Sequence, residues 1–300
     1  MRITNNMVTN NLINEIQSLN TQQSQLQGQV ASGLAVTQPS DNPSAFGQVI
    51  ELESQNQQLD QYASNATQAL QVANSTYEGL NSMSSIYDRA TQLGSLATGT
   101  NGPNAQQAYA TELGQLIQQA VQVANTQIGG TYVFAGTATN AAPFTATTDS
   151  NGNITAVNYV GNTNQASIPL SPGTSVAPGS TGATNQGLAT MINNMISLQT
   201  AMVAGNVPNI DTANQAMISD EDTLTNAVAE NGATQARIQS EQTQQTNETT
   251  ELGTVIANDT SVNLPTTEVN LNQAELAYQA ALQTAASVMH LSILNYINLS

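Results

Sequence analysis

The chain has 300 residues and a formal net charge of −17, with 20 Asp and Glu residues against three Arg residues and no Lys. Nucleic acids and anionic membrane surfaces bind clusters of basic side chains, so neither is an expected partner. The absence of cysteine excludes disulfides and thiolate metal sites, and no apolar run approaches the roughly 20 residues that a membrane-spanning helix needs.

The first predicted helix runs from about Ile3 to Val30, and its apolar side chains follow a heptad spacing. The seam consists of Leu12, Ile16, Leu19, Gln23, Leu26 and Val30, with Gln23 as a polar interruption. Gly33 weakens the helix, and the segment PSDNP (Pro39–Pro43) breaks it. Asn42 followed by Pro43 is a favourable N-cap and first-turn pair for a second helix.

The second predicted helix is long, from about Ser44 to Leu96, and a third follows the turn Thr98–Pro103. The seam of the second helix is Ala63, Ala66, Leu70, Ala73, Tyr77, Leu80, Ser84 and Tyr87, whose small members imply close helix approach. The apolar face of the third helix carries Tyr109, Leu113, Leu116, Ala120 and Val123. The third helix is expected to reach about Ile128, where Gly129-Gly130 stops it.

Residues 131–183 change to a β-rich pattern. Phe144–Thr148 and Ile154–Val160 flank the turn Asp149–Gly152, which predicts a hairpin. The remaining expected segments are a strand at Thr131–Gly136, a strand at Gln165–Leu170 and a loop at Ser171–Gly182. The interpretation is a small β-rich insert between helical regions.

Helical spacing returns after the insert. The first of these helices carries Leu188, Ile192, Met195, Leu198 and Met202, and Val207–Asn209 is expected to break it. A long helix over Ile210–Val262 is seamed by Met217, Leu224, Val228 and Ile238. Pro265 marks a further break, and the last helix carries Leu271, Tyr278, Leu282, Ala285 and Met289.

These elements predict a mainly α fold of long antiparallel helices, with a small β-rich insert and the two chain ends paired as a coiled-coil stem. The expected divisions are residues 1–40 and 263–300 for the stem, 41–130 and 184–262 for a helical rod, and 131–183 for the insert. An exposed Leu or Ile forfeits about 1.5–3 kcal/mol of burial, so each terminal stripe needs a partner. The expected assembly-interface residues are Met7, Leu12, Ile16, Leu19, Leu26, Val30, Leu271, Tyr278, Leu282, Met289, Leu291, Ile293, Leu294, Tyr296 and Ile297.

No catalytic, cofactor or metal site is expected. His290 is the single histidine, which excludes a three-histidine metal site, and its helix offers no plausible Ser or Cys relay for a general base. Asp149, Asn151 and Asn153 resemble a calcium loop faintly, but turn chemistry explains them better. The acidic run Asp220–Asp222 is expected to lie on a solvated helix face, because adjacent helical positions do not share a face.

Three patches resemble the flagellin superfamily, and within it the hook-associated protein 3 group of hook–filament junction proteins. They are the MRIT start with Ser18–Pro43 (SLNTQQSQLQGQVASGLAVTQPSDNP), the segment Gly129–Phe144 containing GGTYVFAGT, and Ala274–Ile297 (AELAYQAALQTAASVMHLSILNYI). The sequence departs from the family pattern at Leu34 and Ala35, where Lys or Arg is common, at Asn42 in place of Asp, and in the patch GATQAR (Gly232–Arg237).

The resemblance implies a structural subunit that joins the bacterial hook to the filament, with no enzyme activity and no cofactor. It further implies a ring of copies between a preceding hook-associated protein and flagellin, and a cytoplasmic export chaperone on the C-terminal helix. The N-terminal sequence has no apolar signal region, so we expect export to the extracellular flagellum without a cleaved signal peptide.

Two other functions remain open from the sequence. The chain could be flagellin itself, the filament subunit, which differs in copy number from a single junction ring. It could also be a secreted adhesin or binding module, with residues 131–183 as the recognition head and the helices as a stalk.

Overall fold

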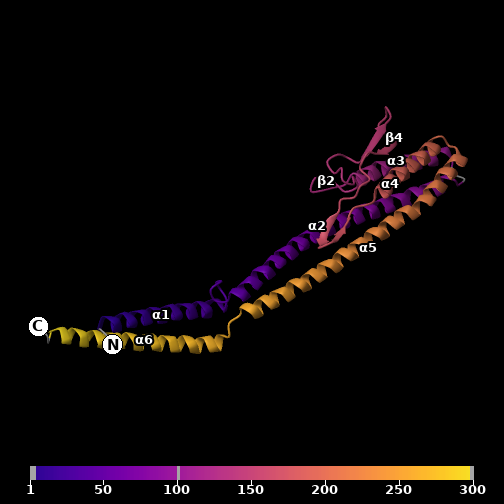
Figure 1. Cartoon of the computed structure of the whole chain (residues 1–300). Coiled ribbons are helices and arrows are strands. Elements are labelled where there is room, and N and C mark those ends of the chain that lie inside the picture. The colour runs from indigo at the N-terminus through magenta and orange to yellow at the C-terminus, as the bar shows by residue number, and fades with distance from the viewer. Residues whose placement is uncertain (1–4, 100–101, 298–300) are drawn as a thin grey trace. The chain divides into compact units, whose positions relative to one another are not determined.

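The computed structural model describes the backbone of residues 5–99 and 102–297, and the side chains of residues 7–99 and 102–290. Its helices are α1 (Asn5–Ser32), α2 (Pro43–Ala97), α3 (Pro103–Ala124), α4 (Gly182–Val203), α5 (Val207–Thr260) and α6 (Leu264–Ile297). Its strands are β1 (Gln127–Ile128), β2 (Thr131–Tyr132), β3 (Phe144–Thr148), β4 (Ile154–Tyr159), β5 (Ile168–Ser171) and β6 (Thr174–Val176). The predicted mainly α fold with long antiparallel helices and a small β-rich insert is confirmed (Figure 1).

The chain divides into two compact units. One contains residues 1–57 and 249–300, and holds α1, α6 and the adjoining ends of α2 and α5; we call it the terminal unit. The other contains residues 58–248 and holds α3, α4, the strands and the remaining parts of α2 and α5; we call it the central unit.

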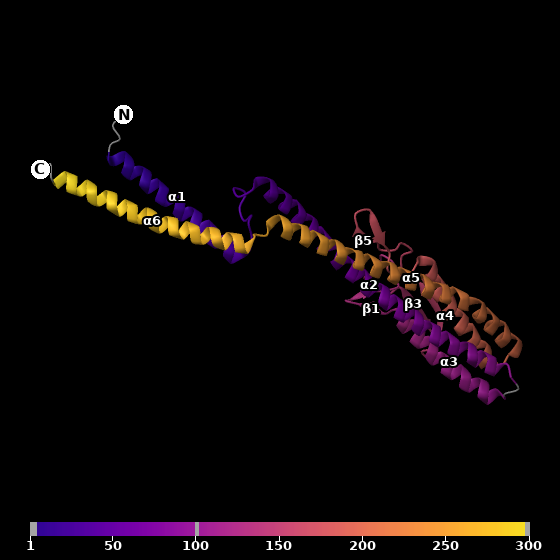
Figure 2. The same cartoon turned by 90° about the horizontal axis from the view of Figure 1, so that it is seen from below.

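In the central unit, four helices lie side by side around one hydrophobic core (Figures 1 and 2). The largest fully buried side chains of this core include Leu80, Tyr87 and Leu93 of α2, Leu113 and Ile117 of α3, and Ile192 and Met195 of α4. Ile210, Met217 and Leu224 complete it from α5. Gly94 lets α2 approach α5 closely, because a Cβ atom there would stand 2.2 Å from Oδ1 of the buried Asn214.

The seam of α2 differs from the predicted one at every second position. Ala66, Ala73, Leu80 and Tyr87 are buried as expected. Between them the buried line runs through Ala69, Thr76, Met83 and Ala90, whereas Tyr77 is 37% exposed and Leu70 and Ser84 are only partly buried. The small side chains of Ala69 and Thr76 permit the close packing, and the larger Tyr77 is therefore turned outward.

The β-rich region consists of three separate two-stranded antiparallel hairpins, β1–β2, β3–β4 and β5–β6. The predicted β3–β4 hairpin is confirmed. Gly129-Gly130 does not stop α3 directly; α3 ends at Ala124, and the two glycines, with φ of 55° and 84°, form the tight turn of the β1–β2 hairpin. The predicted loop Ser171–Gly182 contains β6, because Gly173 at φ 80° turns the chain back onto β5.

One other boundary differs from the expected one, whereas the expected break near Pro265 does separate α5 from α6. Val207–Asn209 begins α5 instead of separating it from α4, and Gly205, at φ 65°, makes the turn. Pro265 lies in the first turn of α6, where a missing backbone N–H costs no helical hydrogen bond. The predicted start of α2 is confirmed: α2 begins at Pro43, and Asn42 Oδ1 accepts from the Ala45 N–H at 3.2 Å.

Side-chain amides fasten the hairpins to the helices. The Asn125 carboxamide accepts from the Phe144 N–H at 3.0 Å and donates to its carbonyl at 2.9 Å. Asn193 of α4 pairs with the backbone N–H and carbonyl of Val157 in the same way, at 2.9 and 2.8 Å. Each amide therefore replaces a neighbouring strand at one outer edge of the β3–β4 ladder.

The β5–β6 hairpin packs over the parts of α2 and α5 that lie farther from the main core. Leu170 and Val176 of the hairpin form a second core cluster with Ala66, Ala73 and Ile238. Its backbone carbonyls also accept side-chain donors: Asn65 donates to Pro169, Gln245 to Leu170 and Arg237 to Ser175. The hairpin thus contacts both α2 and α5 in a region where the buried residues of α2 are all alanines.

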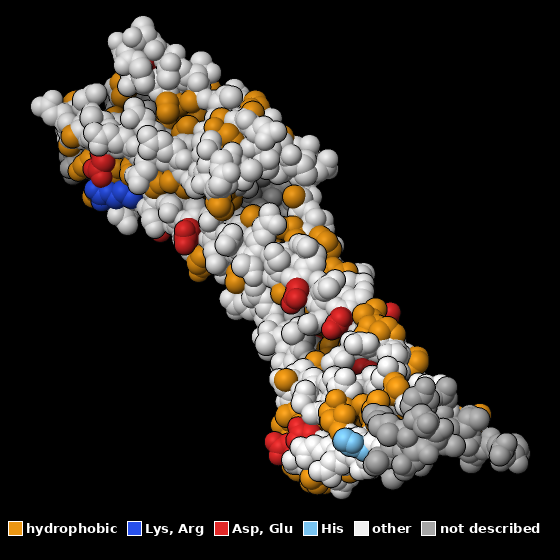
Figure 3. Space-filling model, turned by 90° about the vertical axis from the view of Figure 1, so that its left-hand side faces the viewer, with side chains coloured by type: hydrophobic (Ala, Val, Ile, Leu, Met, Phe, Trp, Pro, Cys, Tyr) orange, Lys and Arg blue, Asp and Glu red, His pale blue; other side chains and the backbone are white. Residues whose placement is uncertain are grey.

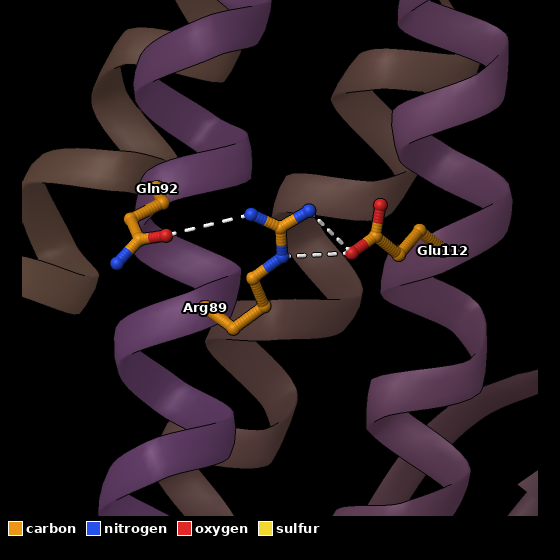
Figure 4. Close-up of polar contacts among 3 residues, drawn as sticks. All are labelled: Arg89, Gln92 and Glu112. Atoms are coloured by element: carbon orange, nitrogen blue, oxygen red, sulfur yellow. Dashed lines mark hydrogen bonds and ion pairs between the residues drawn. The ribbon is translucent and has the colours of Figure 1, made fainter.

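An ion pair joins α2 to α3 at the surface (Figure 4). The Arg89 guanidinium lies 2.7 Å from Glu112 Oε1 and also donates from Nη1 to Gln92 Oε1 at 3.4 Å. The side chains of Arg89 and Glu112 are 45% and 42% exposed, so the pair is screened by water and salt. The apolar core, not this ion pair, holds the two helices together.

Because Leu113 is 0% exposed in the core, truncating its side chain should destabilise the folded protein strongly. Leu113→Ala should lower the free energy of unfolding by about 2–5 kcal/mol, through lost burial and the cavity left behind. Leu96→Ala, at a side chain 46% exposed, is the matched control and should change it by about 0.5 kcal/mol or less. Denaturant unfolding followed by helical circular dichroism measures both, and equal effects would contradict the core assignment.

Candidate assembly interface

The terminal unit is built on the antiparallel pairing of α1 and α6, whose outer ends carry the two chain termini (Figures 1 and 2). Beyond the other end of each helix, the chain forms a short β-bridge between Leu34 and Ser261. The Ala35 N–H donates to the Thr260 carbonyl at 2.6 Å, and the Val262 N–H donates to the Gly33 carbonyl at 3.0 Å. This bridge fixes which residues of the two helices lie at the same level.

The α1 side of the pair follows the heptad seam read from the sequence. Leu12, Ile16, Leu19, Gln23, Leu26 and Val30 are all partly buried, while the residues between them are mostly exposed. None of the six is fully buried. The polar Gln23 occupies its place in the seam without breaking the helix.

The α6 side presents smaller residues than the sequence suggested. Its covered line is Leu271, Ala274, Tyr278, Ala281, Ala285 and Val288, which repeats every three and four residues. Ala274 is buried at 5% exposure and the others are partly buried. Ala274, Ala281 and Val288 were not singled out from the sequence; the steps of three and four residues from Leu271 and Tyr278 were the available signal.

The expected interface residues therefore fall into three groups. Leu12, Ile16, Leu19, Leu26, Val30, Leu271 and Tyr278 lie partly covered in the α1–α6 seam. Met7, Leu282 and Met289 lie outside it, with exposed fractions of 56%, 44% and 55%. The side chains of Leu291, Ile293, Leu294, Tyr296 and Ile297 lie outside the described residues.

A second apolar line on α6 faces away from α1. Val269 and Leu276 are 54% and 66% exposed, and on a helical wheel they stand opposite the covered line. Leu264, Leu282 and Met289 border the covered line on one side and are also exposed. Helix α6 is therefore apolar on more than one face, which is typical of a helix with more than one packing partner.

Asp41 accepts several hydrogen bonds in the segment that connects α1 and α2. Its Oδ2 accepts from the backbone N–H groups of Thr37 and Gln38, both at 3.0 Å, and from the Thr37 hydroxyl. Its Oδ1 accepts from Gln25 of α1 at 3.1 Å. The hydrogen bonds from Thr37 and Gln38 hold the pKa of the Asp41 carboxyl below its usual value.

Polar residues considered as catalytic or metal-binding candidates have structural partners. Asp149 accepts from the backbone N–H groups of Asn151 and Asn153, at 2.8 and 2.9 Å, which confirms the turn interpretation. Asp220 accepts from the Tyr87 hydroxyl at 3.3 Å and from Asn194; burial, and then the Asp220 charge, raise the pKa of Tyr87. Among the described side chains, no group of three or more His, Asp or Glu residues could hold a metal ion.

None of the helices, over the part of the chain that the structure describes, combines the length and apolar character needed to cross a membrane.

Comparison with known proteins finds similarity to flagellar proteins over about half of the chain. Residues 3–139 match the bacterial flagellin N-terminal helical region. Flagellar hook-associated protein 3 of Salmonella typhimurium (strain LT2) is 31% identical over 146 residues, which are 48% of this chain and 46% of that protein. The chain thus matches about half the length of this curated relative.

Solved structures share the fold. A Vibrio parahaemolyticus protein described as a flagellar hook-associated protein has 18% identity and a TM-score of 0.65, over 74% of this chain and 100% of that one. FlgL of Bacillus cereus has 21% identity and a TM-score of 0.59, over 69% of this chain and 98% of that one. At these identities the likeness shows the fold alone.

The β-bridge between Leu34 and Ser261 predicts that an engineered disulfide would form efficiently there. Leu34 and Ser261 form the narrow type of antiparallel pair, in which the Cα atoms stand about 4.5 Å apart, within the range a disulfide needs. Because the natural chain has no cysteine, Leu34→Cys with Ser261→Cys should close an intramolecular disulfide on mild oxidation. Non-reducing electrophoresis of the monomer measures it. Ile13→Cys with Ser261→Cys is the control and should stay open; equal closure in both would contradict the register.

The Asp41 contacts predict a titration seen at neighbouring amides. A carboxyl with a depressed pKa stabilises its loop above its unfolded pKa, and this contribution is lost as the pH falls through the lower, folded pKa. The amide proton shifts of Thr37 and Gln38 should therefore titrate together, with a midpoint below that of aspartate in an unfolded peptide, as measured by NMR. Asp41→Asn should abolish both titrations, and Asp60→Asn, on the exposed face of α2, should leave them unchanged. A midpoint above that of the peptide would overturn the assignment.

Proposed function

We infer that this flagellin-like chain is a structural subunit of the bacterial flagellum that joins the hook to the filament. The observation that carries this proposal is the incomplete cover of the α1–α6 pair, since every residue of the α1 seam remains partly exposed. A pair of helices with one shared seam leaves its other apolar side chains in water until further molecules pack against them. The similarity to hook-associated protein 3 supports the choice of the junction.

Exposed hydrophobic side chains are concentrated in the terminal unit. Among the described residues, 15 large hydrophobic side chains are exposed, and nine of them belong to this unit: Met7, Ile13, Leu34, Ile50, Leu264, Val269, Leu276, Leu282 and Met289. The terminal unit is the smaller of the two units, so the enrichment is not a matter of size. Hydrophobic side chains also reach the surface of the helix pair on the face drawn in Figure 3.

The terminal helices themselves carry few charges. The chain has 20 acidic residues, but only Glu15 lies among the first 40 residues, and no Asp, Glu, Lys or Arg follows Glu275. Like charges on neighbouring copies repel over about 10 Å at 0.1 M ionic strength. Copies that meet through α1 and α6 therefore bring few charges together, since α1 carries only Glu15 and α6 only Glu268 and Glu275.

In the proposed assembly, copies of the chain form a ring, with a preceding hook-associated protein on one side and flagellin on the other. The location is the extracellular flagellum, reached by export through the flagellar channel. A cytoplasmic chaperone would cover α6 before export, and the exposed Val269, Leu276 and Leu282 are apolar side chains of the kind that such a partner shields. The absence of cysteine means that no disulfide has to form after export.

The adhesin and filament-subunit alternatives receive less support. The β elements are three short, separate hairpins and not one continuous sheet. Packing and side-chain amides attach β3–β4 and β5–β6 to the helices. A filament subunit would share the same helix pairing, so copy number is what separates it from a junction protein.

The proposed function predicts one labelled position per flagellum. An antibody against residues 131–183, imaged on detached flagella of the source bacterium, should mark a single point between hook and filament. Label along the whole filament would indicate flagellin instead, and label on the cell surface alone would favour the adhesin.

A truncation gives the matched control for this experiment. A chain without residues 281–300 loses the outer part of α6 but keeps the whole central unit. Its central unit should therefore stay folded, while the label at the junction disappears. Normal incorporation of the truncated chain would contradict assembly through the terminal helices.

A further inference from the structure

The methionines divide sharply between the two units. Met83, Met191, Met195, Met202 and Met217 belong to the core of the central unit and are at most 1% exposed. Met7 of α1 and Met289 of α6 are 56% and 55% exposed. Met1 lies outside the described residues.

The two exposed methionines lie at the same end of the helix pair. Leu34 and Ser261 are level at the base of the pair. Met7 lies 27 residues before Leu34, and Met289 lies 28 residues after Ser261. The two segments, from Met7 to Leu34 and from Ser261 to Met289, are helical over nearly all of their length. Since each helical residue adds the same rise, the two methionines lie at the same level, near the chain termini.

We propose that Met7 and Met289 are a pair of oxidation sites at the outer end of the helix pair, and that their sulfoxides oppose the packing of further copies there. The chain has no cysteine and no tryptophan, so exposed thioethers are its most readily oxidised side chains. The consequence for packing rests on the proposed function; the assignment of the oxidation sites does not.

The reaction requires a peroxide from the surroundings. One oxygen atom passes to the thioether sulfur: the S–O bond forms, the O–O bond of hydrogen peroxide breaks, and the second oxygen leaves as water. The sulfur loses two electrons and the peroxide gains them. The product is a polar, chiral sulfoxide in place of a flexible apolar side chain.

The position of the two residues decides what the sulfoxides do. Neither thioether belongs to the covered α1–α6 seam, so oxidation leaves the intramolecular pair in place. Both belong to the exposed apolar surface that further copies would cover. An unpaired sulfoxide oxygen buried in such a contact should weaken association by about tenfold to hundredfold.

The first part of the test locates the oxidation. The full-length chain is treated with hydrogen peroxide under conditions that keep it folded, and sulfoxides are assigned by peptide mass spectrometry. Met7 and Met289 should be oxidised while the five core methionines remain intact. Comparable oxidation of the core methionines, or resistance of Met7 and Met289, would overturn the assignment.

The second part measures self-association by sedimentation velocity at raised salt, which screens the repulsion between acidic copies. Peroxide should weaken the association of the natural chain by about tenfold or more. The double variant Met7→Leu, Met289→Leu, compared with its own untreated sample, should be insensitive to peroxide. Met202→Leu, at a buried core position, should be as sensitive as the natural chain.

The outcomes separate this inference from the proposed function. Equal association of oxidised and untreated natural chain would refute the effect of the sulfoxides and leave the junction role standing. A peroxide effect that persists in the double leucine variant would refute the assignment to these two residues. An untreated chain that stays monomeric at every salt concentration would contradict the packing proposed for the terminal helices, and the effect of the sulfoxides with it.

Discussion

The terminal unit depends on one limited interaction, the single shared seam between α1 and α6. On α6 only Thr267 and Ala274 are buried among the described side chains, and on α1 none is. Two helices alone cannot enclose a core, because each keeps most of its circumference in water. The bridge at Leu34 and Ser261 sets the register of the pair. The pair is thus aligned within one chain, while its remaining apolar surface stays exposed.

The central unit is held together by different means. Its four helices enclose a continuous core, and neutral amides of Asn125, Asn193 and Gln245 fasten the hairpins to the helices. Hydrogen bonds between neutral groups are little affected by ionic strength, whereas repulsion between copies with 20 acidic residues each is screened by salt. Salt can therefore change how copies approach one another without changing the fold of this unit.

Local signals in the sequence were enough to predict most of the helices and the α1 seam. Asn42 and Pro43 marked the start of α2, and heptad spacing identified the α1 seam including its polar Gln23. The seams of α2 and α6 were predicted less well, since larger residues such as Tyr77 and Leu282 were preferred over nearby small ones. On a helix, adjacent rows of side chains spaced three or four residues apart fit the same hydrophobic periodicity almost equally well. Which row is buried depends on the partner helix, which is distant in sequence. The sequence predicts a helix stop at Gly129-Gly130, whereas the structure has a hairpin turn there, because a glycine pair suits a helix end and a hairpin turn equally well.

The position of the charges is compatible with the association proposed for the terminal helices. If the acidic residues were spread evenly, any contact between copies would bring like charges together. Instead the first 40 residues contain only Glu15 among the acidic residues, and none follows Glu275. In these segments Gln, Asn, Ser and Thr provide solubility without charge. Removing such neutral polar side chains from water costs less free energy than removing charged ones. Burial of the terminal helices between copies would therefore bring few like charges together.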